Sequence, residues 1–229
     1  MLSLGECSII DILNNLFSQI IRFTEQKQNV LLQQKAFGEN SDDWSSCNKR
    51  IEFIDSMSKL INSIIFCMID NGKINVLFGA FLEMMTTIRR SANYNVTIQD
   101  GQKLIPQSNI YNKLMSYIVK CTCRLTKFLG ERIDEVSPDL ILYKVHLYFE
   151  EFGKSANNAN TNMNDVDVGL KMIKTIINEM VNIFQEKIWE FYNLIDQFGQ
   201  TNDENLLGMW IKNYLDNKNK TYFFAFKKT

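Results

Sequence analysis

The chain has 229 residues, of which 45% are hydrophobic and 12% are aromatic. This composition is sufficient for a packed core in one sizeable domain or two small ones, without metal ions or disulfides. The 25 basic and 26 acidic residues give a formal net charge of -1, which excludes a bulk electrostatic attraction to nucleic acid or to an anionic membrane.

Apolar residues recur every three or four positions along most of the chain, and the two prolines, Pro106 and Pro138, lie outside these patterns. The sequence therefore predicts an all-α fold of about eight helices. The first helical segment spans residues 8–37 and begins with Ser8 as its N-cap. Residues 38–47 are rich in Ser, Asp and Asn, which predicts a loop that contains Trp44.

A first helix pair is predicted over residues 48–92. Its turn is the dipeptide Asn71-Gly72, which is suited to a positive φ. A second pair is predicted over residues 109–153, in which Gly130 is expected to end the first helix in the left-handed conformation.

The second helix of that pair has a clear start signal. Ser137 is suited to the N-cap, Pro138 to the first helical position, and Asp139 to the positive end of the helix dipole. Gly153 is expected to end this helix, and the Asn-rich segment that follows, up to residue 165, is predicted to be a disordered insertion.

A third pair and a terminal helix are predicted over residues 165–216, with Thr201 and Glu204 as the capping box of the terminal helix. Residues 217–229 form a tail with basic residues and four aromatic ones. The three pairs start near residues 51, 110 and 168. A repeat of helix hairpins with long inserts predicts one domain, a HEAT-like α-solenoid of antiparallel helix pairs.

Sequence motifs for catalysis or cofactor binding are missing. The chain contains no glycine-rich phosphate loop, no zinc-protease helix motif and no nucleophile elbow. Five cysteines without C-x-x-C spacing and a single histidine argue against a zinc site and favour reduced, buried thiols. The N-terminal segment lacks the pattern of a signal peptide, and no apolar run approaches the ~20 residues of a membrane span. We therefore expect a non-catalytic protein without cofactor or metal in the cytoplasm.

His146 is the only candidate for acid–base catalysis. Two interpretations are open. The favoured one is a histidine on the helix surface that pairs with Glu150 at i+4, and the other is a general base beside a deep internal pocket in a helical enzyme or ligand-binding bundle.

The one localised charge feature is a row of basic residues in the second pair. Their separations of seven, four and three residues place them on one edge of a helix, and we name them the basic ridge: Lys113, Lys120, Arg124 and Lys127. Arg132 follows the ridge, and Arg89 and Arg90 are expected nearby if the repeats stack in order. The ridge is either a binding surface for an acidic partner or a solvated helix edge. Trp44 likewise either packs on the first helix or contacts a partner.

Three blocks of the sequence resemble one known family. They are YNKLMSYIVKCTCRLTKFL at 111–129, DLILYKVHLYF at 139–149 and LKMIKTIINEMV at 170–181, and the stretch 60–88 is similar as well. Together they resemble the C-terminal, sixth TOG-like domain of the mini spindles or TOG family of microtubule polymerases.

The resemblance implies a HEAT-like, TOG-like paddle that binds other proteins at spindle poles or microtubule ends. The implied partners are cytoskeletal: coiled-coil spindle-pole adaptors, γ-tubulin complexes or tubulin. In the family, N-terminal TOG domains bind tubulin through loops along one edge, which gives an alternative role for Trp44 and Lys73. The chain departs from the family in its long Asn-rich insertion after Gly153 and in lacking the small distal helical bundle. The contact candidates are therefore the basic ridge, Arg132 and Trp44.

Overall fold

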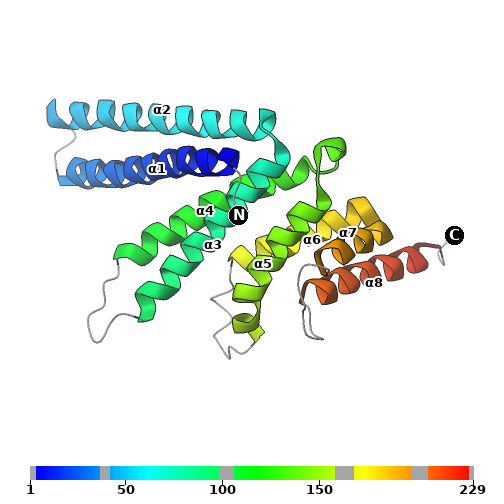
Figure 1. The fold of residues 1–229 in the computed structure, drawn as a ribbon. Coiled ribbons are helices and arrows are strands. Elements are labelled where there is room, and N and C mark those ends of the chain that lie inside the picture. Colours follow the sequence, from blue (N-terminus) through cyan, green and yellow to red (C-terminus); the bar gives the residue numbers. More distant parts are fainter. Residues whose placement is uncertain (1–3, 37–41, 98–105, 158–167, 197–205, 227–229) are drawn as a thin grey trace.

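The computed structural model describes residues 4–36, 42–97, 106–157, 168–196 and 206–226 (Figure 1). Eight α-helices lie in these residues: α1 Leu4–Ala36, α2 Asp42–Asn71, α3 Ile74–Thr97, α4 Pro106–Lys127, α5 Pro138–Asn157, α6 Val168–Phe184, α7 Ile188–Asp196 and α8 Leu206–Phe226. Two short 3-10 helices, η1 Ile133–Glu135 and η2 Gln185–Lys187, precede α5 and α7. The described residues contain no strand, and the predicted all-α class is confirmed.

The helices form two stacked layers. One layer follows the order α1, α3, α5 and α7, and the other follows α2, α4, α6 and α8. Successive antiparallel hairpins, clearest in α1–α2 and α3–α4, bridge the two layers (Figure 1). This arrangement is the α-solenoid of antiparallel helix pairs that the sequence predicts.

The hairpins are offset by one helix from the predicted pairs. The predicted pair 48–92 joins α2 with α3, and the predicted pair 109–153 joins α4 with α5. In the structure the most extensive contacts join α1 with α2 and α3 with α4. The difference arises because α1 runs as one continuous helix alongside α2, so that α2 pairs with α1 and not with α3, to which the sequence assigned it.

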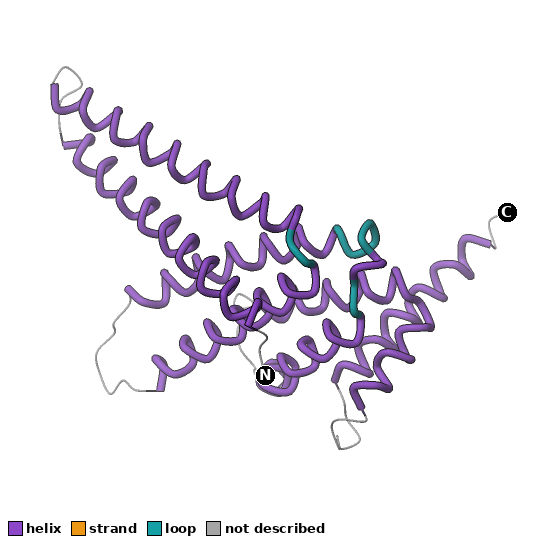
Figure 2. The backbone as a smooth tube through the Cα atoms, turned by 45° about the horizontal axis from the view of Figure 1, so that its top comes forward, coloured by secondary structure: helices purple, strands orange, loops and turns teal. Residues whose placement is uncertain are grey.

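One hydrophobic core runs from Leu13 on α1 to Leu215 on α8. Helix α3 is its centre, since it packs against α1, α4 and α5, and its Phe78 and Phe81 are fully buried. The far ends of α1 and α2 project from the rest of the molecule (Figures 1 and 2). There, a second small cluster holds Val30, Cys47 and Ile54.

Gly72 and Gly153 act through close packing and not through a left-handed backbone. A Cβ atom on Gly72 would lie 2.5 Å from the carbonyl oxygen of Met68 and 2.8 Å from Cδ1 of Leu77. Neither Gly72 nor Gly130 has a φ in the left-handed region, so both predictions of a positive φ were wrong. Gly153 does not end its helix but lies inside α5, where a Cβ atom would come within 2.7 Å of Leu206 on α8.

Several predicted boundaries also differ. Helix α2 starts at Asp42, so residues 42–47 are helical and not a loop; the backbone of Trp44 lies in α2, but its side chain is outside the described residues. Helix α5 extends through Asn157, four residues into the predicted insertion, and α8 continues to Phe226 through most of the predicted tail. The remainder of the insertion and the capping box of Thr201 and Glu204 fall outside the described residues. The predicted start of α5 at Pro138 is confirmed.

The four described cysteines are free, but they are not all buried. Cys47 and Cys121 are buried, Cys123 is partly buried, and Cys67 is exposed, so the expectation of buried thiols fails for Cys67. Burial raises the pKa of the Cys121 thiol to about 12. A thiol with so high a pKa is almost entirely protonated near neutral pH, and only the thiolate reacts readily.

We therefore expect unequal thiol reactivity in the folded protein. In a Cys7→Ser background, Cys67 should react with a disulfide reagent at about pH 8 at least about a hundredfold faster than Cys121. Stopped-flow absorbance would measure the rates, and Cys67→Ser should remove the fast phase. Rapid modification of Cys121 before unfolding would contradict the packing of α4 on the core.

Candidate partner-binding edge

Two short connections of the solenoid lie at the same edge of the molecule. They are the α2–α3 turn at residues 72–73 and the α4–α5 loop at residues 128–137, drawn as neighbouring loops in Figure 2. Asn75 links them. Its Nδ2 donates to the carbonyl oxygen of Glu135 at 2.8 Å and to Oγ of Ser137 at 3.1 Å, and its Oδ1 accepts from the backbone N–H of Ser137 at 2.9 Å. One amide side chain thus fixes the start of α5 against the start of α3.

Arg132 forms a second link between the two connections. Its Nη2 donates to the carbonyl oxygen of Gly72 at 2.8 Å, and its guanidinium also bonds both carboxylate oxygens of Glu135. This hydrogen bonding raises the pKa of Arg132 and lowers that of Glu135. Because Gly72 accepts from the α4–α5 loop, the turn and the loop are positioned together.

Arg124 forms a third link, from α4 to α2. It bonds both carboxylate oxygens of Asp70, with Nη2 at 2.9 and 2.8 Å. Its guanidinium also lies over the rings of Phe66, at 4.6 Å, and Phe128, at 5.9 Å. A planar guanidinium suits both contacts, which a lysine would not reproduce. We name residues 70–75 and 124–137 the braced edge.

The strength of the Arg124–Asp70 pair is modest, because the two side chains are 41% and 38% exposed. We expect a double-mutant cycle with Arg124→Met and Asp70→Asn to give a coupling free energy of about 0.5–1 kcal/mol in urea denaturation. High salt should reduce this coupling. A coupling indistinguishable from zero at low salt would mean that the pair does not hold α4 to α2.

The four residues of the basic ridge lie on one face of α4, as predicted, but they differ in exposure and in whether they form an ion pair. Lys120 and Lys127 are exposed, and within the described ranges neither has a carboxylate oxygen within 4.0 Å. Lys113 is partly buried, whereas Arg124 is engaged by Asp70. The two lysines are therefore the cations of this face that form no ion pair among the described residues, and the ammonium of Lys120 lies 5.7 Å from the ring centroid of Tyr117.

Arg89 and Arg90 do not join the ridge. Arg90 pairs with Glu151 on α5, and the guanidinium of Arg89 lies 5.4 Å from the ring centroid of Phe152. Position 90 is 16 residues beyond the start of α3, or about 24 Å along the helix from the braced edge. Arg89 and Arg90 were expected near the basic ridge, but the ion pair of Arg90 and the ring contact of Arg89 are both with α5.

Lys73 is exposed in the α2–α3 turn, next to the residue that Arg132 bonds. It therefore adds a further cation to the braced edge. Glu131 and Asp134 are exposed in the facing loop, so this end of the edge carries charges of both signs.

His146 is not the surface histidine that the sequence favoured. It is only 8% exposed, and its Nδ1 has no hydrogen-bond partner among the described residues, while Glu150 is exposed. It shares a face of α5 with Leu142 and Phe149 at i−4 and i+3, both of which are buried in the core. Neither the cavity between α1 and α2 nor the one between α5 and α7 is lined by His146.

Among the described residues, no group of three or more histidine, cysteine, aspartate and glutamate side chains is placed to hold a metal ion. None of the helices there is long and apolar enough to cross a membrane.

The sequence alone gave no sign of the bracing residues Asp70, Asn75 and Glu135. Each is a polar residue near a helix end, where such residues are ordinary. Asp70 and Asn75 become structural only because they lie close to Arg124 and Glu135, which are 54 and 60 positions later in the chain, and no short-range pattern encodes that proximity.

Comparison with known proteins finds two distant relatives. The chain is 26% identical over 139 residues to Protein MOR1 of Oryza sativa subsp. japonica and 24% identical over 134 residues to Protein MOR1 of Arabidopsis thaliana. These matches cover 59% and 58% of the chain but only 7% and 6% of the two relatives. No family model and no solved structure matches the chain. The similarity supports the mini spindles or TOG family and extends to no particular TOG domain.

Proposed function

We propose that the chain is a non-catalytic, TOG-like interaction domain of a microtubule-associated polymerase. It acts in the organisation of spindles or microtubule ends by binding cytoskeletal adaptors, as a C-terminal, sixth TOG-like domain would. The observation that carries this proposal is the braced edge, where three side chains fix two connections of a solenoid beside exposed lysines. The similarity to the two MOR1 proteins supports a microtubule-related role and a cytoplasmic localisation on the cytoskeleton.

The physical role of the braced edge is rigid presentation. A loop that is already ordered loses less conformational entropy when a partner binds than a mobile loop does. Asn75, Arg124 and Arg132 supply that order, and in this proposal they position the edge without contacting the partner. Binding sites carried on loops of a rigid scaffold are common for this reason.

Lys120 and Lys127 are the contact residues of this proposal. They are exposed on one face of α4 and have no internal ion pair within the described part of the chain. Their charges suit an acidic surface, such as that of a coiled-coil adaptor, a γ-tubulin complex or tubulin. Because the net charge of the chain is -1, the attraction is local to this face.

Charge reversal tests this assignment. The double variant Lys120→Glu, Lys127→Glu should weaken binding to the cognate partner by about tenfold or more, because both changes turn attraction into repulsion. Biolayer interferometry against purified tubulin, a γ-tubulin complex and a coiled-coil adaptor would measure the affinities.

The matched control is Lys171→Glu, Lys212→Glu, which changes the net charge equally at exposed positions on α6 and α8. It should leave the affinity nearly unchanged. The proposal fails if none of the three proteins binds the wild-type chain, or if both double variants weaken binding to the same extent.

A direct tubulin-binding role is the second candidate, and the exposed Lys73 in the braced edge favours it. This role would use Lys73 and Trp44. Gel filtration with soluble tubulin separates the candidates: a complex that is lost on Trp44→Ala or Lys73→Glu, but retained in the double lysine variant, would assign the chain to direct tubulin binding.

A further inference from the structure

The first hairpin has an apolar stripe that no other part of the described chain covers. Phe53, Met57, Leu60 and Ile64 follow one another on α2 at separations of four, three and four residues, so they share one face. Phe53 is 62% exposed, Leu60 53% and Ile64 42%. The buried face of α2 is a different one, formed by Ile54, Ile61 and Ile65.

A contiguous apolar stripe is unusual on the exposed face of an amphipathic helix, where polar side chains normally lie. A contiguous patch of exposed apolar side chains commonly marks an interaction site, whereas single scattered apolar residues do not.

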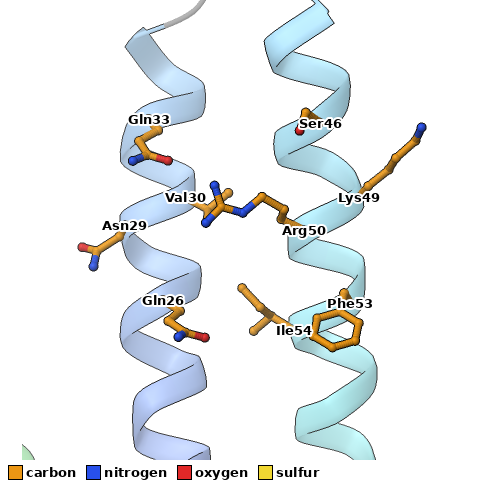
Figure 3. A pocket seen from close by; sticks show the side chains of 9 residues that line it. All are labelled: Gln26, Asn29, Val30, Gln33, Ser46, Lys49, Arg50, Phe53 and Ile54. Atoms are coloured by element: carbon orange, nitrogen blue, oxygen red, sulfur yellow. The ribbon is translucent and has the colours of Figure 1, made fainter.

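The stripe continues into a groove between the projecting parts of α1 and α2 (Figure 3). The groove has a volume of about 600 Å³. Val30 and Ile54 form its apolar floor, and Gln26 and Gln33 line its α1 side. In Figure 3 the guanidinium of Arg50 reaches from α2 toward Val30, whereas Lys49 points away from the groove.

The charge of the groove has one sign. Lys49 and Arg50 are the only charged residues among the nine that line it, and both are basic, but only the Arg50 side chain is directed into it. Neither has a carboxylate within ion-pair distance in the described ranges of the chain. An occupant that brings carboxylates to this end of the stripe would therefore gain electrostatic complementarity.

We propose that this groove and stripe bind an acidic amphipathic helix of a partner protein. The stripe runs about 16 Å along α2, which matches the apolar face of three helical turns. Apolar anchors at separations of three and four on the partner would lie against Phe53, Leu60 and Ile64, while acidic residues near one end would meet Lys49 and Arg50. Gln26 and Gln33 on α1 carry no charge, so they would not repel the polar flank of such a helix.

A second copy of the chain fits this surface less well. In a symmetric dimer, Lys49 and Arg50 of each copy would need acidic partners on the same face of α2 in the other copy. The nearest acidic residues on α2 are Glu52, which is off the stripe, and Asp55, which pairs with Lys27. The proposed site stands on different elements from the braced edge and does not depend on the function proposed above.

Fluorescence anisotropy with two synthetic peptides tests the site on the full chain. The probe is a labelled amphipathic peptide of about 20 residues, with leucine at every third or fourth position and glutamate on both flanks; the control peptide has lysine in place of glutamate. We expect the acidic peptide to bind at least about tenfold more tightly than the basic one. Leu60→Ser, and separately Lys49→Glu with Arg50→Glu, should each weaken that binding by about tenfold or more.

Leu147→Ser is the matched control, since Leu147 is 44% exposed on α5 and remote from the groove. It should leave peptide binding unchanged. The proposal is overturned if the acidic peptide does not bind, if the two peptides bind alike, or if Leu147→Ser weakens binding as much as Leu60→Ser does. A wild-type dimer that Leu60→Ser dissociates in sedimentation would assign the face to a second copy and would also overturn it.

Discussion

Replacing Phe81 by alanine should lower the free energy of unfolding by about 4 kcal/mol. Phe81 is fully buried on α3, the helix that packs against α1, α4 and α5 at once. Removing its ring therefore takes away buried apolar surface and leaves a cavity that three neighbouring helices line. Urea denaturation followed by far-UV circular dichroism would measure the change.

Phe53→Ala is the control for this prediction, because it makes the same chemical change at a side chain that is 62% exposed. It should alter the free energy of unfolding by no more than about 0.5 kcal/mol. If the two variants were equally stable, α3 would not be the centre of the core.

Gly72→Ala should destabilise the protein by about 2 kcal/mol. The added Cβ would lie 2.5 Å from the carbonyl oxygen of Met68, which already accepts the Gly72 N–H at 2.8 Å. That contact is with backbone, so relief requires the end of α2 to move, and this would disturb the acceptor that Arg132 uses. Thermal unfolding would report the loss as a lower melting temperature.

Gly130→Ala provides the comparison, since its nearest new contact would be Cδ1 of Ile183 at 3.9 Å. That distance is ordinary van der Waals contact, and the expected change is within about 0.5 kcal/mol. A Gly72→Ala protein as stable as the Gly130→Ala protein would show that the α2–α3 turn adapts freely and that the edge is not rigid.

The sequence predicted the helices well because their signals are local. The apolar period of 3.6 residues located every long helix, and the Ser137-Pro138 signal placed the start of α5 correctly. The pairing of helices was offset by one, because an amphipathic stripe shows that a face is covered without showing which helix covers it. The glycines were misread for a similar reason: Gly72 and Gly153 are required by neighbours in space, and a lone sequence shows only their conformational freedom.

The candidate edge was predicted in part. The spacing of the basic ridge identified one face of α4 correctly, since helical geometry alone decides it. Asp70 forms an ion pair with Arg124, whereas Lys120 and Lys127 have no ion pair among the described residues, and this difference depends on how α2 packs on α4. His146 was misjudged because its near neighbours in sequence are both polar and apolar, and only the packed structure shows that its face of α5 is buried.

Site-specific photo-crosslinking tests the central claim, that cytoskeletal partners bind at the braced edge. A benzophenone amino acid would be placed at Lys73, at Lys127, and at Thr87, which is exposed on α3 about 20 Å from the start of that helix. Each protein would be irradiated with tubulin, a γ-tubulin complex and a coiled-coil adaptor. We expect crosslinks to at least one of these proteins from positions 73 and 127 and none from position 87. Crosslinking from position 87 alone, or from none of the three positions, would contradict the account.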